Sequence, residues 1–263
     1  MARFKVGIDL HPQHCTVAEL RRAWMAADEL GVDTIWTWDH FFPLPAGRMV
    51  AAAPNPATAG THFEAWTLLT AMAVETSRAR VGTLVTANGL RNPDLLADMA
   101  RTIDHLSGGR LILGIGAGWA ERDYREYGYE FDPPPARLKA LGESLVRVKA
   151  RFGQLQPGPA GPLPILVGGG GERVTLKLVA QHADMWNAFG PVDSWTRKNR
   201  ILDDWCVKVE RDPSEIERTV GIAPDEVDNW QAYLEAGAEH IIVMVPPPFD
   251  LCATETLLAA ARS

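Results

Sequence analysis

Residues 81–119 read VGTLVTANGLRNPDLLADMARTIDHLSGGRLILGIGAGW, and this stretch decides the fold. A short apolar run at 81–86 is followed by a helical pattern that opens at Pro93, a residue well suited to the first turn of a helix. The expected buried stripe of that helix is Leu96, Met99, Ile103 and Leu106. A second apolar run follows at 110–115. Two such runs joined through a helix predict a parallel strand–helix–strand unit.

The same alternation continues along the whole chain, outward from this unit. The eight apolar runs lie at 4–10, 34–38, 81–86, 110–115, 164–167, 184–189, 216–222 and 240–245. They are almost continuously apolar, as expected for strands that are covered on both faces. Eight strand–helix units in about 250 residues predict a (β/α)₈ TIM barrel, one domain over residues 1–263. The alternative is a doubly wound open sheet, which needs fewer strands and a switch point in the strand order.

Composition limits the classes of function. The chain has 263 residues and a net charge of −7, from 26 basic and 33 acidic residues, which argues against nucleic acid as the main partner. Cys15, Cys206 and Cys252 form no C-x-x-C pair, so neither a disulfide framework nor a thiolate zinc site is indicated. We expect no signal peptide, no membrane span and a cytoplasmic protein.

Glycines follow the fourth and fifth strand runs, at the barrel end where chemistry is expected. Gly168, Gly169, Gly170 and Gly171 precede a helix expected at 172–182, where backbone N–H groups and the helix dipole favour a phosphate. The alternative is a flexible connector. The turn Gly114-Ile-Gly-Ala-Gly118 lacks the G-x-G-x-x-G spacing of a dinucleotide fingerprint. Its bare backbone favours a flat ligand lying against it.

Side chains at other strand ends supply the remaining candidates. Asp39 and His40 pair a carboxylate with an imidazole, which suits proton transfer near neutral pH, although a polar strand end that only caps the barrel is the alternative. His11 and His14 resemble a metal-binding pair, but no third ligand appears at later strand ends, so we expect no metal site. His14 is instead a candidate for ligand contact. Trp38 and Trp119 are expected to wall an apolar, planar ligand.

Taken in order, several segments resemble the bacterial luciferase-like flavin superfamily, and most nearly its oxidoreductases that use the deazaflavin coenzyme F-420. These segments are residues 34–43, 81–86, 91–93, 107–119 and 164–171, with a weaker match at 223–242. The resemblance implies a barrel whose mouth holds the ring of F-420, with FMN as the alternative cofactor. It also implies a non-proline cis peptide behind the ring, at the bond that here joins Leu84 and Val85, and it suggests a homodimer.

The resemblance assigns roles to particular residues. It implies that Asp39 and His40 correspond to the catalytic pair, with His40 near the reactive edge of the ring. The cofactor contacts that we expect, from the residues and the resemblance together, are Asp39, Leu84, Val85, Thr86, Asn88, Ala117, Gly118 and Gly168 to Gly171. The expected substrate contacts are His14, Trp38 and Trp119. Arg122, Arg125, Arg173 and Lys177 are candidates for a basic rim; the alternative is that they are solvated helix charges.

One departure narrows the expected function. The branch that oxidises glucose 6-phosphate carries a glutamate proton donor where Trp119 stands here, so sugar-phosphate oxidation is not expected. The prediction is an oxidoreductase that transfers a hydride between F-420 and another small organic substrate. An FMN-dependent luciferase-like monooxygenase, a non-catalytic flavin-binding protein and a metal-dependent barrel hydrolase are the alternatives. Comparing the affinities for FMN and F-420, and adding chelators, would separate them.

Overall fold

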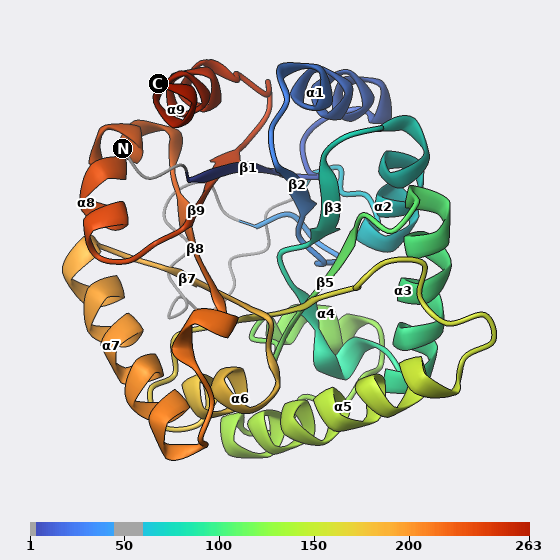
Figure 1. Ribbon diagram of the computed structural model, residues 1–263. Coiled ribbons are helices and arrows are strands. Elements are labelled where there is room, and N and C mark those ends of the chain that lie inside the picture. The colour runs from blue at the N-terminus through green and yellow to red at the C-terminus, as the bar shows by residue number, and fades with distance from the viewer. Residues whose placement is uncertain (1–3, 45–59) are drawn as a thin grey trace.

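Parallel strands close into a barrel with helices around its outside, in a computed structural model that describes residues 4–44 and 60–263 (Figure 1). The strands are β1 (Lys5–Leu10), β2 (Thr34–Thr37), β3 (Arg80–Thr83), β4 (Thr86–Ala87), β5 (Leu111–Gly116), β6 (Ile165–Gly168), β7 (Met185–Phe189), β8 (Glu217–Ile222) and β9 (His240–Val245). Their order is β3-β2-β1-β9-β8-β7-β6-β5-β4, and a β3–β5 pairing closes the circle. The predicted TIM barrel is confirmed, and the open-sheet alternative is wrong.

All eight apolar runs form strands, and the third run forms two. Strand β3 ends at Thr83 and β4 begins at Thr86. The peptide bond between Leu84 and Val85 is cis, as the family resemblance implied. β3 and β4 therefore occupy one position in the barrel and both pair with β5. Most of the loop expected at 43–60 lies outside the described residues.

Nine helices are assigned in residues 4–44 and 60–263. They are α1 (Val17–Leu30), α2 (Ala65–Glu75), α3 (Pro93–Ser107), α4 (Glu121–Glu126), α5 (Pro134–Gln154), α6 (Thr175–His182), α7 (Val192–Lys208), α8 (Trp230–Glu235) and α9 (Cys252–Arg262). Gly31 ends α1 with a φ of 80°, a conformation that favours glycine. In α3, Leu96 and Ile103 are buried, but Leu106 is 50% exposed, so its place in the predicted stripe was wrong. Ala97 and Ala100 face the core there.

Alternation along the strands divides the apolar residues into two layers. Val6, Ile8 and Leu10 of β1 pack outward in the layer shared with the helices. A smaller cluster fills the inside of the barrel, and its buried members are Trp36, Leu84, Ile112, Leu166, Met185 and Ile242. Helices cover the outward layer and the strands themselves enclose the inward one, so most of the strand residues are buried.

A polar network closes the inside of the barrel at the amino end of the strands. The His240 ring contacts Thr34 Oγ1 through Nε2 at 2.9 Å and Glu217 Oε1 through Nδ1 at 2.9 Å. Lys5 Nζ donates to Glu217 Oε2 at 2.6 Å. A Cβ on Gly7 would stand 2.2 Å from Thr34 Oγ1, so only glycine leaves room for this network.

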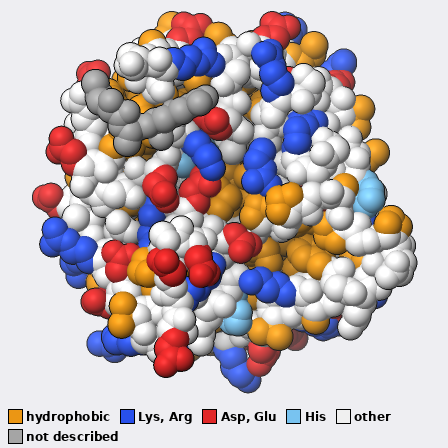
Figure 2. All heavy atoms as spheres, viewed as in Figure 1, with side chains coloured by type: hydrophobic (Ala, Val, Ile, Leu, Met, Phe, Trp, Pro, Cys, Tyr) orange, Lys and Arg blue, Asp and Glu red, His pale blue; other side chains and the backbone are white. Residues whose placement is uncertain are grey.

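Charge is mixed on the face of the molecule shown in Figure 2. Lys and Arg side chains lie among Asp and Glu side chains there, and do not gather into one basic surface. Among the residues that the structure describes, no helix is long and apolar enough to cross a membrane.

Candidate active site

The candidate site is a cavity of about 380 Å³ at the carboxyl ends of the strands. Residues that follow β2, β3, β5 and β6 line it together with the end of β7, joined by residues of α4, α6 and α7. Ten predicted site residues are in this lining: Trp38, His40, Leu84, Val85, Ala117, Gly118, Trp119, Gly168, Gly169 and Gly170. Five others are not: His14, Asp39, Thr86, Asn88 and Gly171.

His40 is held by a carboxylate that sequence reasoning did not select. Its Nδ1 lies 2.6 Å from Asp123 Oδ2 on α4, and Asp123 Oδ1 accepts the backbone N–H of Phe41 at 3.0 Å. Because an ionised carboxylate only accepts hydrogen bonds, we assign the proton of the neutral ring to Nδ1. The other nitrogen, Nε2, then carries the lone pair. Both residues line the cavity.

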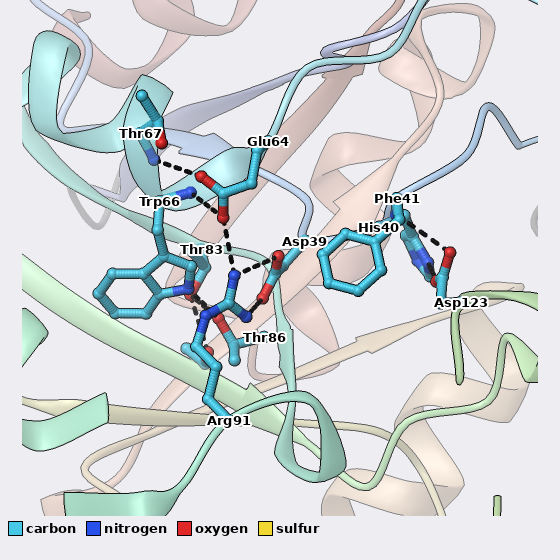
Figure 3. A network of polar contacts seen from close by, with 11 residues as sticks. Asp39, His40, Phe41, Glu64, Trp66, Thr67, Thr83, Thr86, Arg91 and Asp123 are labelled. Carbon is cyan, nitrogen blue, oxygen red and sulfur yellow. Dashed lines mark hydrogen bonds and ion pairs between the residues drawn. The ribbon is translucent and has the colours of Figure 1, made fainter. Parts of the chain in front are cut away.

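Asp39 faces a different set of partners, although it is the neighbour of His40 in sequence (Figure 3). The Arg91 guanidinium bonds both oxygens of its carboxylate and also donates to Glu64 Oε1 at 2.7 Å. Burial raises the pKa of Asp39, and the positive charge of Arg91 opposes that rise. Asp39 therefore anchors the strand end behind His40 and does not pair with its imidazole.

Thr86 belongs to the same support and lies behind the cavity wall. Its hydroxyl accepts from Trp66 Nε1 at 2.9 Å and donates to Thr83 Oγ1 at 3.2 Å (Figure 3). Thr83 in turn donates to the carbonyl of Gly114 at 2.8 Å. These bonds fix the chain on both sides of Leu84 and Val85, and so fix which surface the two residues present to the cavity.

Glycines make the wall around Val85 possible. A Cβ on Gly116 or Gly168 would lie 2.9 Å from a methyl carbon of Val85, closer than side-chain atoms approach. A Cβ on Gly118 would lie 2.0 Å from the Tyr124 hydroxyl oxygen, and its φ of 78° also favours glycine. The bare turn predicted after the fourth run thus gives Val85 and Tyr124 the room to form a flat wall.

A basic side chain stands beside the glycines after β6. A Cβ on Gly170 would lie 2.7 Å from Lys198 Nζ, and one on Gly171 would lie 2.7 Å from Thr175 Oγ1. The Lys198 ammonium forms no ion pair with any residue in 4–44 and 60–263. Backbone, hydroxyl and ammonium together suit an anion. The helix predicted from Glu172 begins only at Thr175, so its dipole is less directly involved than expected.

Aromatic rings form the opposite wall. The Trp119 ring lies 5.4 Å from the His40 ring, edge to face, and is 37% exposed. The Trp38 ring lies 6.3 Å from the His40 ring, also edge to face, and stacks at 3.9 Å on His11. Trp38 Nε1 also donates to His62 Nε2 at 3.3 Å. Burial lowers the pKa of His62 to about 4, so His62 is a neutral acceptor.

Two buried polar atoms near the wall have no hydrogen-bond partner in the described part of the chain: Asn88 Oδ1 and the Tyr124 hydroxyl. Tyr124 lines the cavity, and burial raises its pKa to about 12, so it stays protonated. Unpaired buried polar groups are uncommon in folded proteins. Of the two, only Tyr124 lines the cavity, so its hydroxyl is available to a ligand there.

Among the site residues that the sequence did not reveal, Asp123, Tyr124 and Lys198 are the ionisable ones. The first two lie on α4, a helix of six residues that is too short for hydrophobic periodicity to show. Lys198 is one of several charges on α7, and nothing in its spacing marks it. The basic rim suggested by the sequence did not include Lys198. Two of its members, Arg122 and Arg125, form ion pairs with Glu126 and Glu121 on their own helix.

The chain belongs to the luciferase-like monooxygenase family, whose model matches residues 1–250. An uncharacterised protein of Mycobacterium tuberculosis is 28% identical over 246 residues, covering 84% of each chain. The phthiodiolone/phenolphthiodiolone dimycocerosates ketoreductase of M. tuberculosis is 37% identical over 139 residues, which are 49% of this chain and 35% of that protein. Membership of this family supports an enzyme.

Solved structures with the same fold hold two kinds of cofactor. An F-420-dependent secondary alcohol dehydrogenase, in complex with an F-420–acetone adduct, matches with a TM-score of 0.83 and 15% identity, over 99% of this chain and 100% of that one. A 3,6-diketocamphane monooxygenase of Pseudomonas putida, in complex with FMN, matches with a TM-score of 0.70 and 14% identity, over 97% and 96%. Because the sequence identities are this low, the two structural matches show that the fold is shared and no more.

Proposed function

We propose that this protein transfers a hydride between the deazaflavin coenzyme F-420 and a small alcohol or carbonyl compound other than glucose 6-phosphate. The observation that carries this proposal is the His40–Asp123 pair, which lines the cavity across from a wall of glycine backbone. Interconverting an alcohol and a carbonyl moves one hydride and one proton. An oriented imidazole suits the proton, and a bound cofactor would supply the hydride chemistry.

The residues present fit a cofactor of this kind. The wall formed by Val85 and the glycines is bare enough for a planar ring, and the cavity volume lies within the usual range for cofactor sites. Gly169, Gly170 and Lys198 would hold a phosphate of its side chain. The unpaired Tyr124 hydroxyl would meet polar atoms of the ring or side chain. When bound, F-420 would supply the carbon that accepts or donates the hydride.

His40 would handle the proton. Because Asp123 accepts the Nδ1–H, the Nε2 lone pair is free to take the hydroxyl proton of an alcohol as its hydride leaves. In the reverse direction the protonated ring returns that proton to the carbonyl oxygen. Asp123 stabilises the charged imidazolium in both directions, as carboxylates do beside catalytic imidazoles. Trp38 and Trp119 would hold the apolar part of the substrate at either side of His40.

An FMN-dependent monooxygenase is the second candidate, favoured by the family match and by the FMN-bound structure of the same fold. The ring and phosphate contacts would be the same. Chemistry with oxygen, however, needs an enclosed and dry pocket. A non-catalytic flavin-binding protein would bind the cofactor and turn over no substrate.

Titrating the purified protein with F-420 and with FMN, by quenching of cofactor fluorescence, tests the cofactor. Tighter binding of F-420, followed by its reduction with small secondary alcohols, supports the proposal. Substituting His40→Ala should lower turnover roughly 10²- to 10⁴-fold while leaving the affinity for F-420 unchanged. The matched control is His105→Ala, an exposed histidine on α3 outside the cavity. Tighter binding of FMN, or full activity of His40→Ala, would contradict the proposal.

A further inference from the structure

Asn187 presents an unpaired oxygen to the cavity. The residue is 1% exposed, lies on β7 and lines the cavity. Met185 and Phe189, two residues before and after it, pack with the inward cluster, so its side chain also faces inward. Its Oδ1 forms no hydrogen bond with any residue in 4–44 and 60–263, and it is not among the buried atoms that are sealed from solvent. The oxygen is therefore open to a ligand in the cavity.

A neighbouring hydroxyl fixes which end of the amide faces the cavity. Asn187 Nδ2 lies 2.9 Å from Thr219 Oγ1, and this hydroxyl also lies 3.0 Å from the carbonyl oxygen of Trp186. Because a carbonyl oxygen can only accept, the hydroxyl proton goes to Trp186, and Thr219 must accept from Asn187. The amide nitrogen is therefore held at Thr219, and the oxygen is turned away from it. This network gives the cavity an acceptor and not a donor.

Asn187 stands at the edge of the glycine wall. It is paired in register with Gly168 of β6, and its backbone carbonyl accepts the N–H of Gly169 at 2.9 Å. Gly168 leaves room for Val85, whose methyl carbon would lie 2.9 Å from a Cβ at that position. Neighbouring strands are about 5 Å apart. The Asn187 amide is therefore a polar side chain one strand beyond the flat surface that Val85 and Gly168 form.

His40 stands on the other side of the barrel. It follows β2, and the strand order takes four steps from β2 to β7 in either direction, through β1, β9 and β8 or through β3, β5 and β6. Figure 1 shows these two strands on opposite sides of the barrel. Both residues line the cavity. A planar ring that rests on the wall with its reactive edge at His40 therefore points its far end toward Asn187.

An amide oxygen can bind only a donor, so it selects between the two ends of such a ring. The pyrimidine end of FMN and of F-420 carries an N–H group between two carbonyl groups. The opposite end carries a phenolic hydroxyl in F-420 and two methyl groups in FMN. A carbonyl or methyl group placed against Oδ1 would leave the amide oxygen unpaired, which is costly in a buried site.

We propose that Asn187 positions the cofactor ring by accepting a hydrogen bond from a donor at its far end, either the pyrimidine N–H or the phenolic hydroxyl. This inference rests on the proposed function, which supplies a ring of this kind with its reactive edge at His40. The unpaired oxygen and its fixed orientation come from the fold alone. If the donor is the phenolic hydroxyl, Asn187 also selects F-420 over FMN, since FMN has no donor at that end.

Fluorescence titration of the purified protein with F-420 and with FMN tests the contact. Asn187→Leu, which keeps the branched shape and removes the acceptor, should lower the affinity for F-420 about tenfold, the effect of one hydrogen bond. Thr219→Val, which frees the amide to turn, should cause a smaller loss. Met185→Leu is the matched control: it changes another inward residue of β7, outside the cavity lining, and should keep the wild-type affinity.

A second pair of probes identifies the donor. Lumiflavin and 3-methyllumiflavin both lack a phosphate, and a methyl group replaces the pyrimidine N–H proton in the second. A pyrimidine contact predicts that the wild type prefers lumiflavin about tenfold, that Asn187→Leu loses this preference, and that FMN and F-420 weaken alike. A phenolic contact predicts that F-420 alone weakens.

Two results would overturn the assignment. One is unchanged affinity of Asn187→Leu for both cofactors, and the other is an equal loss for all four probes, which would show a structural role only. Failure of the proposed function gives a different result. If the wild type bound neither F-420 nor FMN, the proposed function would fail and this assignment with it. If His40→Ala kept full activity while Asn187→Leu weakened binding selectively, only the proton-handling role would fail.

Discussion

The two ends of the barrel interior differ in whether their buried polar groups have hydrogen-bond partners. At the amino end, His240, Thr34, Glu217 and Lys5 are bonded to one another, and Gly7 leaves them room. At the carboxyl end, Asn187 Oδ1 and the Tyr124 hydroxyl have no partner in the described part of the chain. The same barrel interior thus contains a completed network and an incomplete one.

The difference follows from what each end does. A buried polar group is tolerated when its hydrogen bonds are complete, and then it helps to specify the fold. Groups left incomplete cost stability and are useful only where a ligand arrives. Changes at the amino end should therefore affect stability, and changes at the carboxyl end should affect binding and turnover.

The largest effect is expected at the carboxyl end, from Asp123→Asn. The amide can donate to His40 Nδ1 and so favour the tautomer with its proton on Nε2, and it cannot stabilise the imidazolium. Turnover should fall roughly 10²- to 10³-fold, with unchanged cofactor affinity and a changed pH profile. Steady-state kinetics over a pH range provide the measurement. A variant with normal turnover would show that Asp123 only anchors the loop.

The next effect concerns the amino end and stability in acid. Burial alone would raise the pKa of Glu217, but the hydrogen bond and charge of His240 and the contact with Lys5 outweigh burial and lower it from 4.5 to about 2. The resulting stabilisation, on the order of 3 kcal/mol, is fully present above pH 4.5 and is lost as the pH falls toward 2.

Urea unfolding at a series of pH values measures this dependence. Glu217→Gln should be less stable at pH 7 and should lose much of the acid dependence below pH 4.5, while cofactor affinity stays unchanged. If Glu217→Gln were as stable as the wild type at neutral pH, the network at the amino end would not contribute to stability, and the contrast drawn between the two ends would be wrong.

A smaller effect is expected at the glycines after β6. Lys198→Ala should weaken the affinity for FMN or F-420 by about tenfold, since it removes a charge-assisted contact to phosphate. Riboflavin, which lacks the phosphate, should bind the wild type and the variant alike. Lys177→Ala, an exposed lysine on α6, is the matched control. Equal losses for riboflavin and FMN would place Lys198 away from the phosphate.

The smallest effect is expected for Trp119→Ala. The ring is partly exposed and contacts the cavity from one side, so its loss should raise KM about three- to tenfold, the worth of one aromatic contact. Turnover at saturating substrate should change little. A large fall in kcat instead would mean that Trp119 orients His40, whose ring it meets edge to face.

The sequence predicted the fold well because the fold depends on repeated local patterns. Each apolar run is a strand, and the break after Thr83 lies where the resemblance placed the cis bond. It predicted the glycine positions for the same reason, since a glycine requirement follows from the local backbone. Helix ends were predicted less well: α6 begins at Thr175, three residues after the expected start at residue 172.

Pairings between distant side chains could not be predicted in this way. Asp39 and His40 are adjacent in the chain, and adjacency suggested a pair. In the structure Asp39 bonds to Arg91, 52 residues away, and His40 bonds to Asp123, 83 residues away. Side chains of neighbouring residues at a strand end point to opposite sides, so their partners come from different elements.

Sequence alone was enough to predict the eightfold alternation of strands and helices and the glycine turns at the carboxyl ends of the strands. Only the tertiary structure decided which carboxylate holds His40, which lysine stands beside Gly170, and which groups, Asn187 Oδ1 among them, remain without a partner. The physical reason is that periodicity and backbone conformation are local properties. Hydrogen bonding between side chains depends on where closure of the barrel brings distant residues together.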